Sequence, residues 1–392
     1  MKRILPLIVV SQFLCTSLWF AGNSIVSNLI QDLQLDDSFL AHITSIIQFG
    51  FISGTLLFAI FTISDRYSPS FVFFISSIMA GLFNIGITLP EISPSTILLF
   101  RFLTGFFLAG IYPVGMKIAS DYYQKGLGKS LGFLVGALVI GTAFPHLLKS
   151  YASSVSWKYV LYITSVLSLL GGSLILLFVP NGPYRKTSSK INFSAFASVF
   201  KNNNFRSAAF GYFGHMWELY SFWAFVPVML KRYDTKHLNN ELIALLSFFI
   251  IAIGGLACVT SGYLSLKLGP KRVATAALSL SCLCCIVSPL FLTTDSIIVL
   301  LVFLFFWSYV VIADSPLFST LVAQNAPEAT RGTSLTIVNC IGFAITIISI
   351  QTINALANTI APEYLYMFLA IGPILGLIAV INNQKIGIKN QL

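Results

Sequence analysis

Twelve long apolar segments follow one another along the chain, separated by short polar connections. A helix crosses the ~30 Å hydrocarbon layer of a membrane with about 20 apolar residues, and each segment is roughly that long or longer. Backbone groups in lipid must be hydrogen-bonded within their own segment, and these segments lack the alternation of barrel strands. The pattern therefore predicts an all-α membrane protein with twelve transmembrane helices, over residues 4–30, 39–63, 69–89, 95–121, 127–149, 157–180, 207–230, 238–265, 272–292, 296–323, 332–357 and 364–382.

The composition agrees with lipid as the main solvent. Of the 392 residues, 56% are apolar and 9% are charged, whereas a soluble domain carries about 25% charged residues. The first segment runs without interruption from Ile4 to Gly22. This run is longer than the roughly 7–15 apolar residues of a signal peptide, so we expect it to be the first span.

Lysine and arginine residues predict the orientation, because short cytoplasmic loops carry an excess of them. With the N-terminus inside, 16 of the 23 fall on the cytoplasmic side, five fall outside, and Arg101 and Lys117 lie within the fourth segment. We therefore expect a multi-pass protein of the bacterial inner (plasma) membrane with both termini in the cytoplasm. This distribution accounts for the net charge of +10, and no sequence feature indicates a nucleic-acid partner.

The longest polar stretch, residues 181–206, divides the chain into two halves of six segments each. The string GKSL at 128–131, after the fourth segment, is similar to GTSL at 332–335, after the tenth. Transporters are often built from such repeats. We therefore expect two pseudo-symmetric six-helix bundles, over residues 1–180 and 207–392, joined by a cytoplasmic linker over 181–206.

No sequence feature indicates a cofactor, a metal or an enzyme. All six cysteines lie inside apolar segments without a paired CxxC or Cys/His spacing. No H-E-x-x-H helix or nucleophile elbow is present. The dispersed charges form no repeated ring of the kind that lines a channel pore.

Several motifs resemble those of the major facilitator superfamily of secondary transporters, over essentially the whole chain. The family's G-x-x-x-D-R-x-G-R-R loop has a degraded copy, SDRYS at 64–68, and a second copy, GYLSLKLGPKR at 262–272. The fourth segment carries Arg101 four residues before Gly105, similar to the family's R-x-x-x-G pattern. The fifth has glycines before Pro145, similar to an antiporter motif.

Three further strings resemble a bacterial group often labelled nitrate/nitrite porter-like: SLWFAGN at 17–23, GHMWELYSFWAFVP at 214–227 and ADSPLFSTLVA at 313–323. Nitrate porters have an arginine in spans two and eight. The corresponding segments, 39–63 and 238–265, contain none. The resemblance to that group therefore does not extend to the residues that bind nitrate.

In this family, spans one, four, seven and ten line a central cavity, and the polar and aromatic residues selected below fall on these four. Ionisable groups inside a membrane are costly and usually functional. The resemblance therefore implies a substrate- and proton-binding set on these spans: Asn23, Trp19, Arg101, Lys117, His215, Trp217, Glu218 and Asp314.

The spacing of these residues suggests their roles. His215 and Glu218 lie three residues apart on one helical face, so we expect them to bind a proton together, with Glu218 as the carrier. Asp314, followed by Pro316, is the second candidate carrier. Arg101 either attracts an anion or is a structural hydrogen-bond donor, and Lys117 either serves the cavity or pairs with Asp121.

The resemblance also implies a gate at the cytoplasmic side. Asp65 and Arg66 belong to the first loop motif. The family's arrangement would place Asp65 near the start of span eleven and Arg331, where an acidic group is favoured by the helix dipole. The alternative is that these are ordinary loop charges.

Taken together, these features predict a secondary active transporter that moves a small organic or anionic solute by alternating access, coupled to protons and functional as a monomer in the lipid membrane. Arg101 and Lys117 favour an anion, while the aromatic residues and the two carboxylates favour an organic or cationic compound. An exporter of amphipathic compounds is therefore the alternative within the class. A polytopic membrane enzyme and a passive channel are the alternatives outside it.

Overall fold

The computed structural model describes residues 3–123, 127–152, 156–185, 199–233, 238–328 and 331–389. Every regular element within these ranges is a helix, so the predicted all-helical class is confirmed. Eleven helical segments there are long and apolar enough to cross a membrane. The remaining long helix, α12 (Asn203–Tyr233), has 31 residues, which is also enough to cross. Its polar and aromatic side chains, including His215 and Glu218, give it a lower hydropathy than the others.

The contacts divide the chain into two compact units. Unit 1 comprises residues 1–188 and 224–255, and unit 2 comprises residues 189–223 and 256–392. Parts of α12 and of α13 (Asn240–Leu268) thus belong to each unit. The two-bundle division at 1–180 and 207–392 stays a prediction, and residues 186–198 of the expected linker lie outside the described residues.

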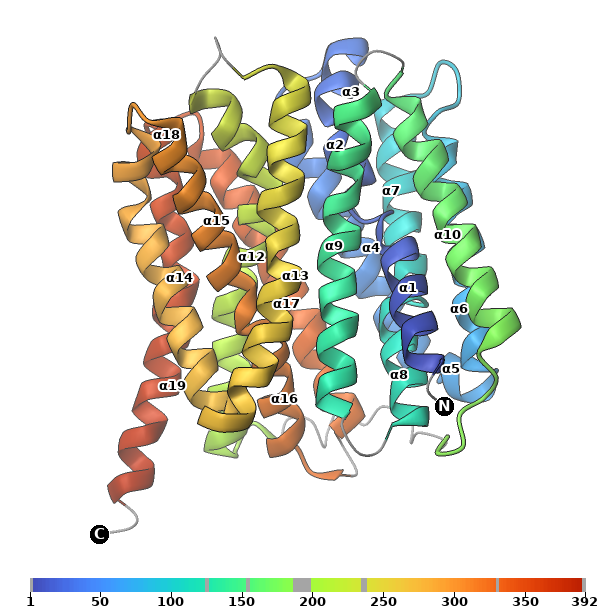
Figure 1. The fold of residues 1–392 in the computed structure, drawn as a ribbon, viewed down its shortest axis with the longest axis vertical. Coiled ribbons are helices and arrows are strands. Elements are labelled where there is room, and N and C mark those ends of the chain that lie inside the picture. The colour runs from blue at the N-terminus through green and yellow to red at the C-terminus, as the bar shows by residue number, and fades with distance from the viewer. Residues whose placement is uncertain are drawn as a thin grey trace. The chain divides into compact units, whose positions relative to one another are not determined.

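Unit 1 contains the helices of the first six predicted spans, whose long members run side by side (Figure 1). In this unit α4 packs on α7, α6 on α10, and α1 on both α9 and α10. The helices are α1 (Ile4–Thr16), α2 (Ala21–Ser24), α3 (Val26–Leu33), α4 (Phe39–Ile60), α5 (Ile63–Arg66), α6 (Pro69–Gly86), α7 (Pro94–Leu108), α8 (Tyr112–Tyr122), α9 (Leu127–Ala152) and α10 (Lys158–Phe178).

Glycines allow the closest of these contacts. A Cβ atom added at Gly50 of α4 would lie 2.0 Å from the Phe102 carbonyl oxygen of α7, and one added at Gly105 of α7 would lie 2.1 Å from the Ile47 carbonyl oxygen of α4. The two backbones therefore touch, as small residues permit in membrane helix pairs.

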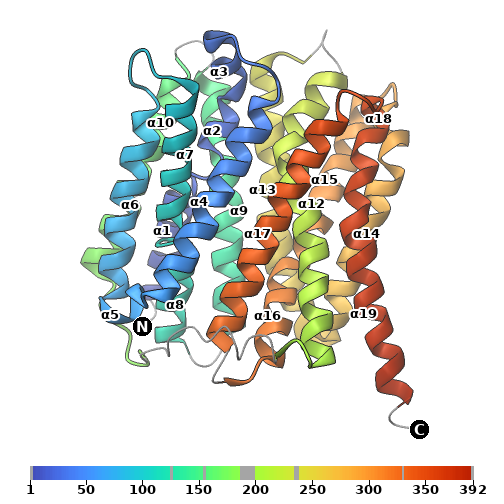
Figure 2. The same cartoon turned by 180° about the vertical axis from the view of Figure 1, so that it is seen from behind.

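Unit 2 contains most of the remaining helices, which Figure 2 shows from the side opposite to that of Figure 1. In this unit α14 packs on α15, α16 and α19. Three hydrogen bonds join α12 to α17: Tyr212 to Asn339, Ser221 to Ser349, and Thr346 to the Met216 carbonyl. The helices not yet named are α14 (Pro270–Leu292), α15 (Ile297–Ala313), α16 (Ser315–Asn325), α17 (Arg331–Leu356), α18 (Pro362–Leu365), the 3-10 helix η2 (Tyr366–Ala370) and α19 (Ile371–Lys389).

Three of the predicted spans are interrupted helices. Span one breaks between α1 and α2, span four between α7 and α8, and span ten at Asp314 between α15 and α16. Pro113 follows the second break and Pro316 the third, and proline removes a backbone donor from the helix. Discontinuous spans expose backbone groups that can bind ions or substrate, so the breaks mark where the site is to be sought.

Candidate functional site

A buried contact between an imidazole and a carboxyl group in unit 2 joins two of the predicted site residues. The Nδ1 atom of His215, on α12, lies 2.8 Å from Oδ1 of Asp314, and both side chains are fully buried. A fully buried carboxylate next to an imidazole is an arrangement in which one proton can be shared. This pair is the strongest candidate for chemistry in the described part of the chain.

The break in span ten positions Asp314 for this contact. Asp314 lies between α15 and α16, and its carbonyl accepts the backbone N–H groups of Leu317 and Phe318. Its side chain makes no capping hydrogen bond to α16, so the carboxyl group is directed elsewhere, towards His215. Pro316 lacks an N–H group, which removes one donor that would otherwise compete for the Asp314 oxygens.

Glu218 lies in a different environment from His215, although the two are one helical turn apart. Its Oε1 atom accepts a hydrogen bond from Nε1 of Trp307 at 2.6 Å and one from the Cys285 thiol at 3.2 Å. Both donors are buried residues, on α15 and α14 respectively. The side chain of Glu218 is therefore held against these two helices.

His215 contacts Asp314, whereas the sequence analysis expected it to act with Glu218. The break in span ten brings the Asp314 carboxyl group to the imidazole, and the joint proton-binding role of His215 and Glu218 stays a prediction. Asp314 therefore has a partner that is 99 residues away in sequence, which no local spacing could indicate. Trp307 and Cys285, as partners of Glu218, were not anticipated either.

Arg101 of α7 is fully buried and binds the backbone at the break in span one. Its guanidinium group donates to the carbonyl oxygens of Leu18 at 3.1 Å and Trp19 at 2.5 Å, and to the amide oxygen of Asn84 at 3.4 Å. Carbonyls that lose their helical partners must be satisfied inside a membrane. This geometry favours the structural interpretation of Arg101 over direct attraction of an anion.

Three other predicted cavity residues also have structural contacts. The Asn23 amide donates to the Thr44 hydroxyl at 2.6 Å, which links α2 to α4. The Trp217 indole donates to the Phe368 carbonyl at 3.1 Å and packs against Gly372 of α19. Trp19, in unit 1, is fully buried and lies beside the Phe51 ring, with 4.8 Å between ring centroids.

Two glutamines in unit 1 stand out that the sequence analysis did not select. The amide groups of Gln12 on α1 and Gln48 on α4 are fully buried, and among the described residues neither has a hydrogen-bond partner. Buried polar groups in proteins are nearly always hydrogen-bonded. The sequence signal for them is weak: both are uncharged, Gln12 follows Ser11, and Gln48 is a single polar residue within an apolar run.

The residues expected at the gate belong to different units. In unit 1, Lys117 of α8 forms an ion pair with Asp65 of α5, with 2.7 Å between Nζ and Oδ1. Arg185 donates to the backbone carbonyls of Asp65 and Tyr67. In unit 2, Arg331 donates from Nε to the Ala323 carbonyl at 2.9 Å. The ion pair gives Lys117 a partner at the loop motif, beside Arg66.

A buried polar pair at a helix break, within a bundle of long apolar helices, is typical of membrane transport proteins. The sequence model of the Major Facilitator Superfamily matches residues 8–350. The chain therefore belongs to this family, and it is a secondary transporter. No curated protein gives a significant match to the sequence.

A solved structure has the same fold. It is a bacterial homologue of the human lysosomal transporter Spinster, in an inward-facing and unoccupied conformation. The alignment covers 97% of this chain and 95% of that one, with a TM-score of 0.70 and 15% sequence identity. The predicted membership of the family is confirmed, while the resemblance to the nitrate/nitrite porter-like group stays a prediction.

Proposed function

We propose that this transporter moves a small organic or anionic solute across the bacterial inner membrane by alternating access, and that protons drive it through the His215–Asp314 pair. The observation that carries the proposal is the 2.8 Å contact between two fully buried titratable groups at the break in span ten. A proton-driven cycle needs a group whose charge changes when water reaches it.

The pair meets this requirement. With one shared proton the pair has no net charge, whichever of the two side chains holds the proton, and a pair without net charge costs least in a dry interior. When water enters, it stabilises the charged carboxylate of Asp314, and the proton can leave. Opening of the site and loss of the proton are then linked, so a proton gradient biases the cycle.

Glu218 is the second candidate carrier. Its contacts with Trp307 and Cys285 hold one carboxyl oxygen in place, and that suits a fixed hydrogen-bond acceptor better than a group that exchanges protons with water. We therefore rank Asp314 above Glu218, which reverses the order that the sequence suggested.

The unpaired side-chain amides of Gln12 and Gln48 in unit 1 help to define the chemical class of the solute. Gln12 and Gln48 each offer an acceptor and a donor that no described residue uses. Polar solutes with several hydrogen-bonding groups would satisfy them, whereas an amphipathic compound would leave them unpaired. This favours a small polar organic or anionic solute over the amphipathic alternative.

The test uses the purified protein. A thermal-shift screen first finds a stabilising solute, which is then followed in proteoliposomes with and without a pH gradient. Asp314→Asn should abolish gradient-driven accumulation but retain exchange of the solute across the membrane, because it fixes the site in an uncharged form. Asp295→Asn, at an exposed carboxylate, is the control and should behave like the unaltered protein.

Two outcomes would contradict this assignment. If Glu218→Gln abolishes accumulation and Asp314→Asn does not, Glu218 is the carrier. If both variants accumulate the solute as the unaltered protein does, the His215–Asp314 pair is structural.

We also propose that Asp65, Arg66 and Arg331 take part in the cytoplasmic gate. The ion pair of Asp65 with Lys117 supports a role for the loop motif in holding one conformation. Because both side chains are partly exposed, the pair contributes about 1 kcal/mol or less, enough to shift a balance between two states but not to hold the fold.

Asp65→Asn should therefore slow transport while expression and substrate affinity stay near normal. Initial transport rates and ligand-induced thermal shifts measure the two effects separately. A large loss of affinity with unchanged rates at saturating solute would argue against a gating role.

A further inference from the structure

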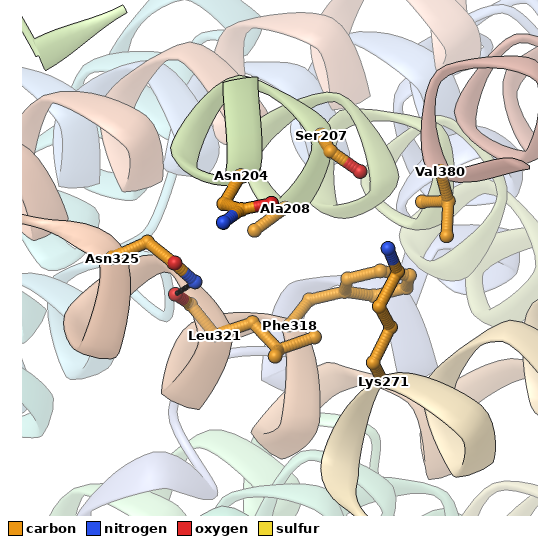
Figure 3. Close-up of a pocket in the computed structure, with 8 residues that line it drawn as sticks. All are labelled: Asn204, Ser207, Ala208, Lys271, Phe318, Leu321, Asn325 and Val380. Carbon is orange, nitrogen blue, oxygen red and sulfur yellow. Dashed lines mark hydrogen bonds between the residues drawn. The ribbon is translucent and has the colours of Figure 1, made fainter. Parts of the chain in front are cut away.

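One end of unit 2 holds a polar cavity apart from the His215–Asp314 pair. It has a volume of about 240 Å³ and is lined by residues of α12, α14, α16 and α19: Asn204, Ser207, Ala208, Lys271, Phe318, Leu321, Asn325 and Val380 (Figure 3). Its size is below the ~300–1,000 Å³ of pockets that enclose drug-sized ligands. It could therefore take a headgroup-sized molecule or part of a larger one.

The polar groups of the cavity point to an anion. Figure 3 shows the Lys271 side chain extending from α14 into the cavity, with its ammonium group towards α12, where Ser207 lies. Among the described residues, neither the Lys271 ammonium nor the Ser207 hydroxyl has a hydrogen-bond or ion-pair partner. Ser207 is nevertheless 95% buried, with 5% of its surface exposed.

The surrounding helices add to this preference. Lys271 lies in the first turn of α14, and Asn204 and Ser207 lie in the first two turns of α12. The N-terminal ends of helices carry partial positive charge and favour anions. The C-terminal end of α16, at Asn325, carries partial negative charge and would disfavour an anion. The Asn325 amide reduces this effect, because it donates to the Leu321 carbonyl at 2.8 Å.

We propose that this cavity binds a phosphate group, either that of an anionic phospholipid headgroup or that of a soluble phosphate compound. Lysine is a strong phosphate ligand as a point charge, and basic pockets between transmembrane helices on the cytoplasmic side bind anionic lipid headgroups. The predicted topology places the start of α12 and of α14 on that side. The proposal is independent of the proton-coupling proposal, since it uses none of its residues.

The experiment compares three ligands on the full-length purified protein: phosphatidylglycerol, zwitterionic phosphatidylcholine, and inorganic phosphate. Native mass spectrometry counts bound lipid, and a thermal shift measures stabilisation. The variant Lys271→Gln removes the charge. Arg272→Gln is the matched control, because Arg272 is the next residue, carries the same charge and is exposed.

We expect phosphatidylglycerol to stabilise the unaltered protein and Arg272→Gln equally, and phosphatidylcholine to have little effect. For Lys271→Gln, the concentration that gives half-maximal stabilisation should rise about fivefold, as expected for one lysine at an anionic membrane surface. If inorganic phosphate stabilises with the same dependence on Lys271, the site takes a soluble phosphate compound instead.

Ser207→Ala keeps the test decisive should Lys271→Gln fail to fold. It removes one hydroxyl donor and should, like Lys271→Gln, weaken the stabilisation by phosphatidylglycerol. Arg272→Gln should keep the stabilisation of the unaltered protein. Equal weakening in Lys271→Gln and Arg272→Gln would show general surface attraction and overturn the proposal. So would an absence of stabilisation by both phosphatidylglycerol and inorganic phosphate.

Discussion

The buried polar side chains of unit 1 fall into two groups. Asn84 and Arg101 each make several hydrogen bonds: Asn84 donates to the Leu161 carbonyl and to the hydroxyls of Thr164 and Ser165, at 3.0–3.2 Å, and accepts from Arg101. Gln12 and Gln48 are equally buried but have no partner among the described residues. The hydrogen bonds of the first group stabilise the bundle. The unpaired amides of the second group destabilise it unless a ligand or water supplies their hydrogen bonds.

This contrast gives a prediction with its own control. Gln12→Leu and Gln48→Leu should leave the melting temperature unchanged or raise it, because an unpaired buried amide is replaced by an apolar group of similar size. Both should weaken the thermal shift caused by the transported solute. Asn84→Leu leaves the Leu161 carbonyl and the Arg101 guanidinium group without this hydrogen-bond partner, and should cost about 1–3 kcal/mol of stability. If the glutamine variants lose as much stability as Asn84→Leu, their role is structural.

Residue chemistry alone predicted which side chains lie inside the membrane but not which of them touch. His215, Glu218 and Asp314 were all selected, and all three are fully buried. The pairing depended on the break in span ten, which directs Asp314 to His215 and leaves Glu218 to Trp307. The length of a helix can be estimated from its apolar run, but contacts between helices depend on packing that a single sequence does not specify.

At the scale of the helices, glycine positions control how closely neighbours approach. Gly50 and Gly54 of α4 face the backbone of α7, where an added Cβ would lie 2.0 and 2.2 Å from the carbonyl oxygens of Phe102 and Phe106. Gly262 of α13 has nothing within 4 Å of the same added atom. Identical substitutions should therefore have opposite effects at these positions.

Gly50→Ala should lower the melting temperature, since relieving the clash means separating two backbones, at a cost of about 1–3 kcal/mol. Gly262→Ala should leave stability unchanged or raise it slightly, because alanine favours a helix more than glycine does. Thermal unfolding of the two purified variants measures the difference. A loss in Gly262→Ala as large as that in Gly50→Ala would show that the contact between α4 and α7 is not the cause.

The helices themselves were largely predictable. Apolar length predicted the spans, and Pro316 indicated the break in span ten. Proline alone is not a sufficient signal, because Pro145, Pro227 and Pro289 lie inside continuous helices. The break in span one has no proline. The backbone turns there through hydrogen bonds from Leu18 to Cys15 and from Trp19 to Thr16, and Arg101 takes up the freed carbonyls. A break stabilised by a side chain 82 residues away leaves no local signal in the sequence.

At the scale of the whole molecule, membership of the Major Facilitator Superfamily covers residues 8–350, and the fold extends over 97% of the chain. The family explains why charged residues concentrate in short connections. It does not by itself fix which side of the membrane they face. The predicted orientation rests on the asymmetry of Lys and Arg, with 16 expected on the cytoplasmic side and five on the other.

The orientation can be tested with reporters that are active on only one side of the membrane. Fusions after Gln391 and after Ser188 should give cytoplasmic signals, because moving the 16 basic residues outward would oppose the charge bias of membrane insertion. A fusion after Glu91, in the connection between spans three and four, is the control and should give a periplasmic signal. A periplasmic signal at Ser188 or Gln391 would overturn the topology. It would also move the cavity at Lys271 away from the cytoplasmic leaflet.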